Sequence, residues 1–227
     1  MLSLQALQRH LGHQFAQPAL LELALTHRSF SADHNERLEF LGDSVLNLAV
    51  SGLLYAQLSR LPEGDLSRIR ANLVKQDTLV TLATELGLSQ VIRLGEGELK
   101  TGGRQRPSIL ADAVEAVIGA VFLDAGFDTA ARLVHHLFRN IEINPKMSAI
   151  GKDPKTELQE WLQARKMGLP NYQVTDTSGA AHQQTFVVSC LVAELNRTEL
   201  GQGHSRRVAE QAAAALMLAH LKTLKKR

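Results

Sequence analysis

The chain has 227 residues, a formal net charge of +2 and 44% hydrophobic residues, which suits one or two domains with a packed core. No apolar run reaches the ~18 residues that a membrane helix needs. The first ten residues alternate apolar and polar side chains and lack the apolar stretch of a signal peptide. A cytoplasmic protein without a membrane partner is therefore expected. The single cysteine, Cys190, cannot form an internal disulfide, and its apolar surroundings predict a core position.

The charge is distributed unevenly along the chain. Residues 1–151 contain 14 Lys and Arg against 16 Asp and Glu, whereas residues 152–227 contain 11 against 7. An acidic part joined to a basic part indicates two activities, one of them the binding of a polyanion. A charge of +4 over the last 76 residues is also common without such a partner, so this observation alone is a weak indication.

Residues 1–142 are predicted to be helical throughout, because Leu, Ala and Val recur at spacings of three and four. Pro18 and Pro107 suit the first turns of their helices. Asp65 is expected to cap the third helix and Gly87 to end it, and a Gly-rich loop, L-G-E-G-E-L-K-T-G-G-R, follows. The predicted helices span residues 18–25, 34–58, 66–86, 107–123 and 129–142.

Residues 144–153 are a predicted linker, since they combine Pro, Gly, Ser and charge without a period. After this linker the pattern changes to an α-β-β-β-α order over about 70 residues. The predicted elements are a helix at 154–167, strands at 172–177, 185–194 and 198–202, and an Ala-rich helix at 205–224.

The segment N-E-R-L-E-F-L-G-D-S-V-L-N-L contains two interleaved stripes at helical spacing. The first is apolar and is predicted to face the core: Leu38, Leu41, Val45 and Leu48. The second is polar and carries three acids: Glu36, Glu39, Asp43 and Asn47. A surface helix usually places Lys or Arg one turn from an acid, whereas like charges here destabilise an isolated helix by about 0.2–0.5 kcal/mol per pair. A bound cation would relieve this repulsion.

The segment S-I-L-A-D-A-V-E-A-V-I-G-A-V-F-L is apolar nearly all round, which predicts a buried helix. It nevertheless carries Asp112 and Glu115, with no basic residue within a turn. Buried carboxylates need partners, and Mg²⁺ suits them because it prefers oxygen ligands. Acidic pairs also occur on helices without metal, and Asp112 near a helix N-terminus would interact favourably with the helix dipole. On the residues alone, both explanations stay open.

These acidic segments resemble the signature of bacterial ribonuclease III. The resemblance extends in order over nearly the whole chain, through N-E-R-L-E-F-L-G-D-S, L-P-E-G-D-L-S-R-I-R-A-N-L-V, L-G-E-G-E-L-K-T-G-G and S-I-L-A-D-A-V-E-A-V-I-G-A-V-F-L-D. It implies a mainly α N-terminal ribonuclease III endonuclease domain at 1–143 and a linker at 144–153. A small α+β (α-β-β-β-α) double-stranded-RNA-binding domain would follow at 154–224.

The resemblance also implies a role for each acid. Glu39, Asp112 and Glu115 would be direct ligands of Mg²⁺, for which Mn²⁺ is expected to substitute, and Glu115 would in addition be catalytic. Asp43 would be catalytic by holding metal-bound water or by ordering the site. Two further acids are implied to be accessory: Glu36 and Glu63.

The implied activity is hydrolysis of double-stranded RNA to 5′-phosphate and 3′-hydroxyl ends with short 3′ overhangs, in the processing of ribosomal precursors and other structured transcripts such as mRNA and tRNA.

The family forms homodimers through the signature helix, which implies an interface role for Phe40; from the residues alone, core packing is the alternative. No P-loop is present, so no nucleotide cofactor is expected. Two rival classes are a duplex-RNA-binding protein that does not cut and another helical metal phosphohydrolase.

The basic part resembles the double-stranded-RNA-binding domain through D-P-K-T-E-L-Q-E-W-L-Q and G-H-S-R-R-V-A-E-Q-A-A-A-A-L. Ser205 is expected to cap a helix whose N-terminus, together with Arg206 and Arg207, contacts phosphates. The chain departs from the family at Val208, where Lys is frequent, and the loss of one phosphate contact predicts weaker or less salt-sensitive binding. Three side chains would reach successive minor grooves: Thr156, Gln159 and His182.

Overall fold

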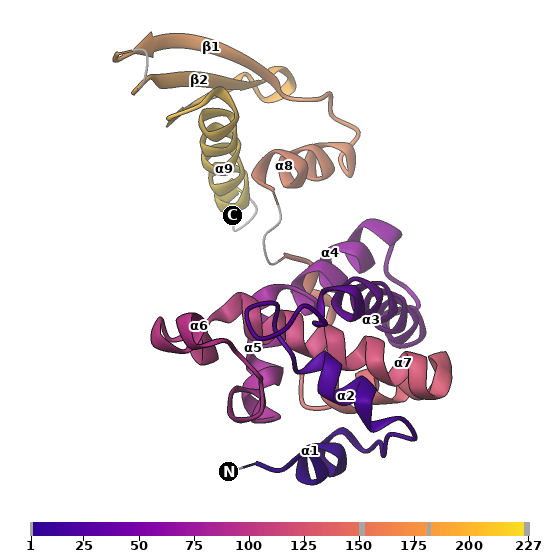
Figure 1. Cartoon of the computed structure of the whole chain (residues 1–227). Helices are drawn as coiled ribbons and strands as arrows, with labels where there is room; N and C mark the ends of the chain where they lie inside the picture. The colour runs from indigo at the N-terminus through magenta and orange to yellow at the C-terminus, as the bar shows by residue number, and fades with distance from the viewer. Residues whose placement is uncertain (1, 150–152, 181–182, 225–227) are drawn as a thin grey trace. The chain divides into compact units, whose positions relative to one another are not determined.

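The computed structural model describes residues 2–149, 153–180 and 183–224. The chain divides into two compact units, Met1–Ile150 and Gly151–Arg227 (Figure 1). The first is helical, and the second combines a three-stranded sheet with two helices. The predicted mainly α part followed by an α-β-β-β-α part is confirmed.

The first unit contains seven α-helices among its described residues. Gly87 adopts a left-handed conformation (φ 69°) just after the helix Gln76–Glu85. The prediction that Gly87 ends a helix is confirmed. Short 3₁₀ turns lie at Leu88–Gln90, Gly103–Gln105 and Pro145–Ala149. The α-helices are α1 (Leu4–Leu11), α2 (Pro18–Ala24), α3 (Glu36–Gln57), α4 (Glu63–Leu73), α5 (Gln76–Glu85), α6 (Glu96–Lys100) and α7 (Pro107–Phe138).

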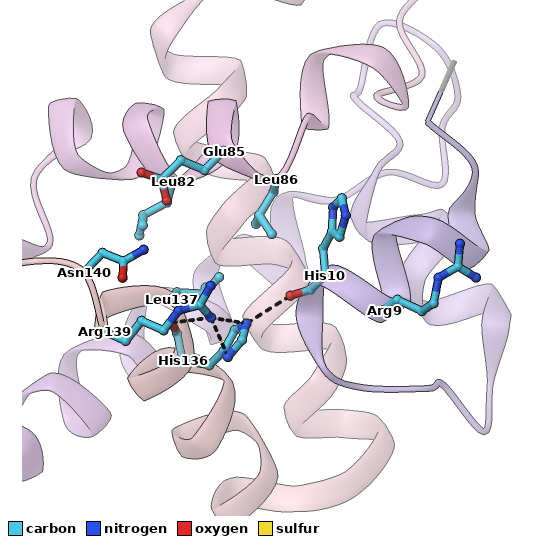
Figure 2. Close-up of a pocket in the computed structure, with 9 residues that line it drawn as sticks. All are labelled: Arg9, His10, Leu82, Glu85, Leu86, His136, Leu137, Arg139 and Asn140. Carbon is cyan, nitrogen blue, oxygen red and sulfur yellow. Dashed lines mark hydrogen bonds between the residues drawn. The ribbon is translucent and has the colours of Figure 1, made fainter.

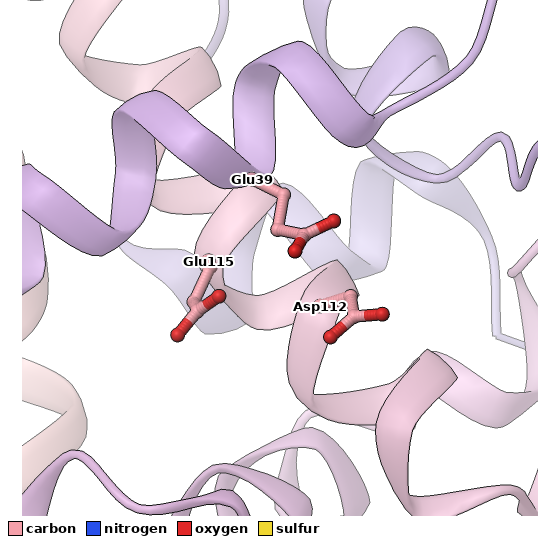
Figure 3. A group of neighbouring side chains, drawn as sticks. All are labelled: Glu39, Asp112 and Glu115. Carbon is pink, nitrogen blue, oxygen red and sulfur yellow. The ribbon is translucent and has the colours of Figure 1, made fainter.

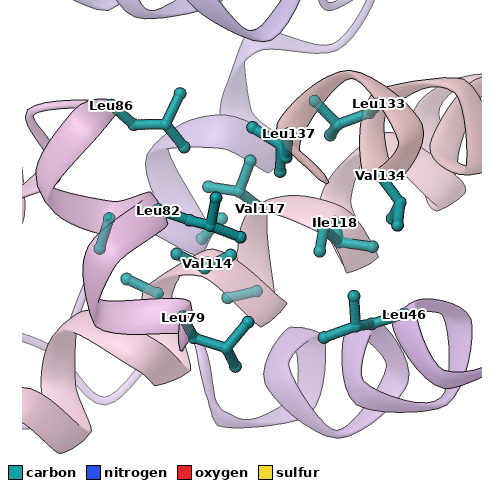
Figure 4. Packing of buried hydrophobic residues seen from close by; sticks show 14 of the residues in the cluster. Leu46, Leu79, Leu82, Leu86, Val114, Val117, Ile118, Leu133, Val134 and Leu137 are labelled. Atoms are coloured by element: carbon teal, nitrogen blue, oxygen red, sulfur yellow. The ribbon is translucent and has the colours of Figure 1, made fainter. Parts of the chain in front are cut away.

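The core of this unit surrounds α7, whose Ala, Val and Ile side chains are buried along most of its first half. Leu79 and Leu82 of α5 pack beside Val114 and Val117 of α7, and Leu46 of α3 enters the same cluster (Figure 4). Among the described helices, α3 is the one whose length and composition would suit a membrane span. Its buried positions belong to the core shared with α7, as in the central helix of a globular domain.

Two glycines allow α3 and α7 to touch through their backbones. A Cβ atom added at Gly42 of α3 would lie 1.8 Å from the carbonyl oxygen of Glu115 in α7. A Cβ atom added at Gly119 of α7 would lie 2.2 Å from the carbonyl oxygen of Leu38 in α3. No side chain fits at either position, so the two helices cross at the shortest distance that their peptides permit.

The predicted helix at 66–86 is wrong, because two helices occupy this region. Lys75 is extended (φ −69°, ψ 156°) and separates α4 from α5, while the Thr78 hydroxyl donates to the Asn72 carbonyl across the break at 3.1 Å. Asp65 does not cap α4; Pro62 takes the extended conformation before the helix, and Asp65 lies within its first turn. The predicted Gly-rich loop contains the short helix α6.

The predicted helices at 107–123 and 129–142 are the two arms of α7. Gly126 leaves the helical conformation (φ 77°, ψ 177°) at the junction, as only glycine does readily, and the second arm ends at Phe138. Asp124, just before this kink, has a side chain that is 1% exposed. It accepts hydrogen bonds from the loop after α1: His13 Nε2 at 2.8 Å, Ala16 N at 3.0 Å and Gln17 N at 2.9 Å.

The predicted core face of α3 is correct in part. Leu38 and Val45 are buried, whereas Leu48 is 59% exposed and is not a core residue. The contact with α7 at Gly42 rotates the buried face toward Leu46, so Leu48 points away from the core. A stripe with the strict spacing 3-4-3 drifts around a helix of 3.6 residues per turn, so its last member, Leu48, leaves the buried face.

The second unit begins with α8 (Pro154–Gln163), whose N-terminus is capped by the Asp153 carboxylate through the N–H groups of Lys155 at 2.9 Å and Thr156 at 3.2 Å. The helix ends before the predicted residue 167, because Lys166 has a positive φ of 58°. The remaining elements are β1 (Asn171–Ser178), β2 (Thr185–Val192), β3 (Arg197–Gly203) and α9 (Arg206–Leu224).

The sheet is antiparallel with the order β1-β2-β3, and Val188 in its centre pairs with Val174 and Gly201. β2 ends at Val192 rather than at residue 194, because a 3₁₀ turn and Asn196 (φ 45°) lead into β3. The helices α8 and α9 enclose a second core with the sheet, and the prediction that Cys190 is buried in it is confirmed.

Candidate functional site

Three carboxylates meet where α3 crosses α7. Glu39 comes from α3, while Asp112 and Glu115 lie one turn apart on α7 (Figure 3). One oxygen atom from each side chain lies within 4.8 Å of the others, and all three side chains are partly buried. The structure therefore brings together the three acids that the sequence analysis singled out as metal ligands.

The helix crossing explains why these acids converge. Gly42 is one turn beyond Glu39 on α3 and touches the backbone of Glu115. Gly119 is one turn beyond Glu115 on α7 and touches the backbone of Leu38, the neighbour of Glu39. The two backbone contacts flank the acids, so the positions of their Cα atoms are fixed by peptide packing. The sequence analysis missed both glycines, although a glycine inside an apolar helix is itself a sign of close packing.

The electrostatic cost of this arrangement is visible in the acids. Burial, followed by the charges of Asp43, Glu39 and Asp112, raises the pKa of Glu115 to about 8. Burial also raises the pKa of Glu39 and of Asp112, with further contributions from neighbouring carboxylates. Within the described residues no lysine or arginine forms an ion pair with the three acids. A cluster of oxygen ligands without a direct ion pair to a protein cation fits a divalent metal ion.

Asp43 lies at the edge of this cluster. Its side chain is exposed and accepts a hydrogen bond from the Asn47 amide at 2.8 Å. Its charge is the largest electrostatic contribution from a neighbouring acid to the raised pKa of Glu115. The structure thus places Asp43 close enough to act on the cluster, but not among the oxygen atoms that lie within 4.8 Å of one another.

The two acids expected to be accessory are in different places. Glu36 lines the cleft beside the cluster and forms an ion pair with Arg28 at 3.2 Å. Glu63 lies at the start of α4, where it accepts a hydrogen bond from the Ser67 hydroxyl at 2.7 Å. Among the described residues, no contact joins Glu63 to the cluster.

A cleft of about 710 Å³ opens beside the carboxylates. Glu36, Glu39 and Asp112 line it together with basic and polar residues that the sequence analysis missed: His27, Arg28, Ser29 and Arg106. Burial lowers the pKa of His27 despite the nearby acids. The basic residues come from loops that precede α3 and α7, and the sequence offered only their positions next to predicted helix starts as a signal.

An apolar surface runs along the side of α3 that faces away from the core. Phe40 is 78% exposed, Tyr55 is 77% exposed, and Leu48 lies between them in the sequence. Ordinary core packing of Phe40, the alternative considered from the residues alone, is therefore wrong for this chain.

In the second unit, the residues expected to bind RNA gather around the first turns of α8 and α9. Thr156, Gln159, Arg206 and Arg207 line one pocket of about 620 Å³. Ser205 caps α9 as predicted, since its hydroxyl accepts the Val208 N–H at 3.3 Å. His182 lies outside the described residues. The side chain of Val208 is 38% exposed.

A separate pocket of about 360 Å³ lies between α1, α5 and the end of α7 (Figure 2). The Arg139 guanidinium contacts the His136 ring there, and that ring reaches the His10 carbonyl at 3.1 Å. None of the acids of the cluster lines this pocket. His135 and His136 are both exposed.

Two family models match the chain, one to each compact unit. Ribonuclease-III-like matches residues 17–141, and Double-stranded RNA binding motif matches residues 154–221. Curated relatives named Ribonuclease 3 include one from Variovorax paradoxus that is 69% identical over 219 residues and one from Delftia acidovorans that is 65% identical over the same length. Each alignment covers 96% of this chain and 96% of the relative.

The fold of the first unit also has a solved counterpart. A structure of the nuclease domain of ribonuclease III from Campylobacter jejuni has a TM-score of 0.60 and 41% sequence identity, and the match covers 62% of this chain and 100% of that one. Sequence, family models and fold agree. The chain therefore belongs to the ribonuclease III family, and it is an endoribonuclease with a double-stranded RNA binding motif.

Proposed function

We propose that this endoribonuclease is metal-dependent and cuts both strands of double-stranded RNA, leaving 5′-phosphate and 3′-hydroxyl ends with short 3′ overhangs. The observation that carries the proposal is the cluster of Glu39, Asp112 and Glu115, whose oxygen atoms lie within 4.8 Å of one another in a chain with an RNA-binding motif. We assign residues 1–143 to the catalytic domain, 144–153 to the linker and 154–224 to the RNA-binding domain.

Mg²⁺ is the proposed ion, and Mn²⁺ is expected to replace it, because both accept carboxylate oxygen ligands. Glu39, Asp112 and Glu115 would hold it. When bound, a divalent ion supplies an activated water and neutralises the charge that develops on a phosphate during hydrolysis. The raised pKa values of the three side chains, which result from burial and then from neighbouring carboxylates, are the physical reason for this assignment, because a bound cation stabilises their ionised forms.

Asp43 is proposed to order the site and to hold water beside the scissile phosphate. It stands one turn from Glu39 on α3, and Asn47 fixes its carboxylate through a 2.8 Å hydrogen bond. The Asp43 carboxylate is exposed and accessible to water, whereas Glu115 is partly buried. Glu36 is proposed to shape the cleft with Arg28, and Glu63 keeps an accessory assignment that comes from the family resemblance.

We propose that the chain acts as a homodimer through the apolar side of α3. Phe40 and Tyr55 are large side chains that expose more than three quarters of their surface, which is costly for a monomer and typical of an interface. The Campylobacter jejuni structure concerns a nuclease domain with a region involved in dimer formation, which supports the same assignment here. A two-fold dimer would present one carboxylate cluster to each strand of a duplex.

The RNA-binding domain is proposed to hold the duplex by its shape. Thr156 and Gln159 of α8 would contact 2′-hydroxyl groups in one minor groove, and His182 would reach the next. Arg206 and Arg207, at the N-terminus of α9, would contact phosphates with the help of the helix dipole. The pocket that these α8 and α9 residues share supports a common surface.

We propose a cytoplasmic role in the processing of ribosomal RNA precursors and of structured mRNA and tRNA transcripts. The support is family membership alone. Sequencing the ends of transcripts in cells with and without the enzyme tests it, since precursors are expected to accumulate when the enzyme is absent.

The biochemical test uses long duplex RNA, single-stranded RNA and duplex DNA, each incubated with Mg²⁺, Mn²⁺ or EDTA. Cutting of duplex RNA alone, in either metal but not in EDTA, is expected, and end mapping should give 5′-phosphates. Asp43→Asn and Glu115→Gln should bind duplex RNA as the wild type does without cutting it. Asp77→Asn, at an exposed acid on α5, is the matched control and should cut normally. Binding without cutting by the wild type would favour a regulatory protein instead.

A further inference from the structure

The backbone of His27 is held firmly at one wall of the cleft. Residues 25–27 run beside Arg93: the Arg93 N–H donates to the Leu25 carbonyl at 2.8 Å, and the His27 N–H donates to the Arg93 carbonyl at 3.1 Å. These two hydrogen bonds form a short parallel bridge between segments far apart in the sequence. The position of the His27 backbone is therefore set by tertiary structure and not by a free loop.

The Nδ1 atom of His27 is occupied as a hydrogen-bond acceptor. The Ser29 N–H, which can only donate, points to Nδ1 at 3.2 Å, and the Ser29 hydroxyl lies 2.8 Å from the same atom. That hydroxyl accepts the Gly95 N–H at 3.0 Å, which leaves its own proton directed at Nδ1. A neutral imidazole with an acceptor at Nδ1 carries its proton on Nε2.

The Nε2–H group has no hydrogen-bond partner among the described residues, although its ring lines the cleft together with Glu39 and Asp112. A fixed, uncharged donor beside an acidic cluster is suited to a ligand that carries acceptor oxygens and enters with its charge balanced by a cation. A phosphodiester strand that lies across the carboxylates has this chemistry.

We propose that His27 is a substrate-binding residue whose Nε2–H donates a hydrogen bond to a phosphate oxygen of the RNA strand being cut. The inference rests on the proposed function and adds a contact from the catalytic domain itself. Ser29 is the positioning residue, because it selects the tautomer of His27 and ties the ring to Gly95. Gly95 is required in turn, since a Cβ atom there would lie 2.2 Å from the Ser29 carbonyl oxygen.

The test compares His27→Leu, which removes the donor, with His27→Gln, whose side-chain amide keeps an N–H group at a similar distance from the backbone. Loss of a hydrogen bond to a charged phosphate should lower kcat/KM on duplex RNA by about 10-fold to 100-fold in His27→Leu. His27→Gln should recover most of the loss. His135→Leu makes the same change at an exposed histidine outside the cleft and should leave kcat/KM unaltered.

Ser29→Ala separates the positioning role from the contact. The variant keeps His27 but loses the hydroxyl that orients it, so a smaller fall in kcat/KM than in His27→Leu is expected. The double variant Ser29→Ala with His27→Leu should be no worse than His27→Leu alone, because the two residues act on one contact. Additive losses would refute the positioning role of Ser29.

Two measurements distinguish a phosphate contact from an effect on the carboxylates. Binding of Mn²⁺ to the free protein should be the same in His27→Leu as in the wild type. Each phosphate near the cut is then replaced in turn by a methylphosphonate, which removes one oxygen and the charge. At one position the wild type and His27→Leu should then have the same kcat/KM, because the modified duplex removes from the wild type the contact that the variant already lacks.

A parallel fall in Mn²⁺ affinity would overturn the inference, as would equal defects in the Leu and Gln variants or a defect that persists on every modified duplex. If the wild type cuts no duplex RNA, the proposed function is refuted, and this inference with it. Cutting by the wild type with unchanged kinetics in His27→Leu refutes the inference alone.

Discussion

The Glu115 carboxyl has a pKa of about 8, and its ionised form destabilises the folded state in the absence of metal. Glu115→Gln replaces it with a neutral group of similar shape. A carboxyl with a raised pKa binds its proton more tightly in the folded chain than in the unfolded chain. The contribution of Glu115 to the free energy of unfolding is therefore fully present below its usual pKa of 4.5 and is lost as the pH rises through about 8. Glutamine should remove this loss.

The magnitude follows from the two pKa values. The difference between 4.5 and about 8 corresponds to about 5 kcal/mol, at about 1.4 kcal/mol for each pH unit, if no solvent screened the charge. The side chain is only partly buried, and screening reduces the expected gain in the free energy of unfolding to about 2–3 kcal/mol. For a unit of this size, that gain raises Tm by roughly 4–10 °C.

Scanning calorimetry in EDTA is the assay, at about pH 5 and about pH 8.5, on either side of most of the expected titration. At the lower pH the two proteins should unfold at nearly the same temperature, since wild-type Glu115 is then protonated. At the higher pH the variant should be more stable, although it cuts no RNA. Equal stability at both pH values, or a variant that is less stable at the higher pH, would refute the electrostatic reasoning.

Three further perturbations test other parts of the structure. Gly42→Ala should separate α3 from α7, lowering the free energy of unfolding by about 1–3 kcal/mol and the cleavage rate by about 100-fold, as measured by urea titration and single-turnover kinetics. Asp124→Asn should cost about 1–3 kcal/mol above pH 4 by urea titration, with the difference disappearing as acid protonates the wild-type carboxylate. Arg206→Ala with Arg207→Ala should weaken duplex binding and reduce the slope of log affinity against log salt by roughly one to two.

Each of these has a control and a contrary outcome. Gly64→Ala adds a methyl group where only ordinary contact exists and should not lower stability; an equal loss in both glycine variants would contradict the crossing argument. The pKa of Asp124 is lowered because hydrogen bonds from Gln17, His13 and Ala16 outweigh its burial, so a difference that persists in strong acid would contradict that cause. Arg197→Ala, at an arginine paired with Glu199, should leave the salt slope unchanged.

Local patterns in the sequence predicted those features that depend on neighbours along the chain. Glu39 and Asp43 share a helical face because of their spacing, and Ser205 caps α9 because a hydroxyl before a helix start accepts its free N–H groups. Strand-like runs separated by turn residues indicated the three strands of the second unit. The convergence of Glu39 with Asp112 and Glu115 was suggested by family resemblance, since spacing within each helix says nothing about how two helices cross.

What remained beyond the sequence depends on tertiary contacts. Leu48 fits an apolar stripe by spacing, yet the crossing at Gly42 turns it away from the core. His27 and Ser29 lie in a loop without a period, and their orientation depends on a bridge to Arg93 that only folding creates. The break at Lys75 has no Gly or Pro to mark it and is visible only in the backbone conformation.

The contact between the backbones of α3 and α7 bears on which ions the site selects. Peptides already in contact cannot approach further, so the distance between the Cα atoms of Glu39 and Glu115 has a lower limit that core substitutions cannot change. The size of the space for an ion then depends on side-chain length. An exchange of Asp for Glu moves a carboxylate by about 1.5 Å on a fixed backbone. The short Asp112 between two longer glutamates is thus a natural place to alter preference between a small ion and a larger one such as Ca²⁺.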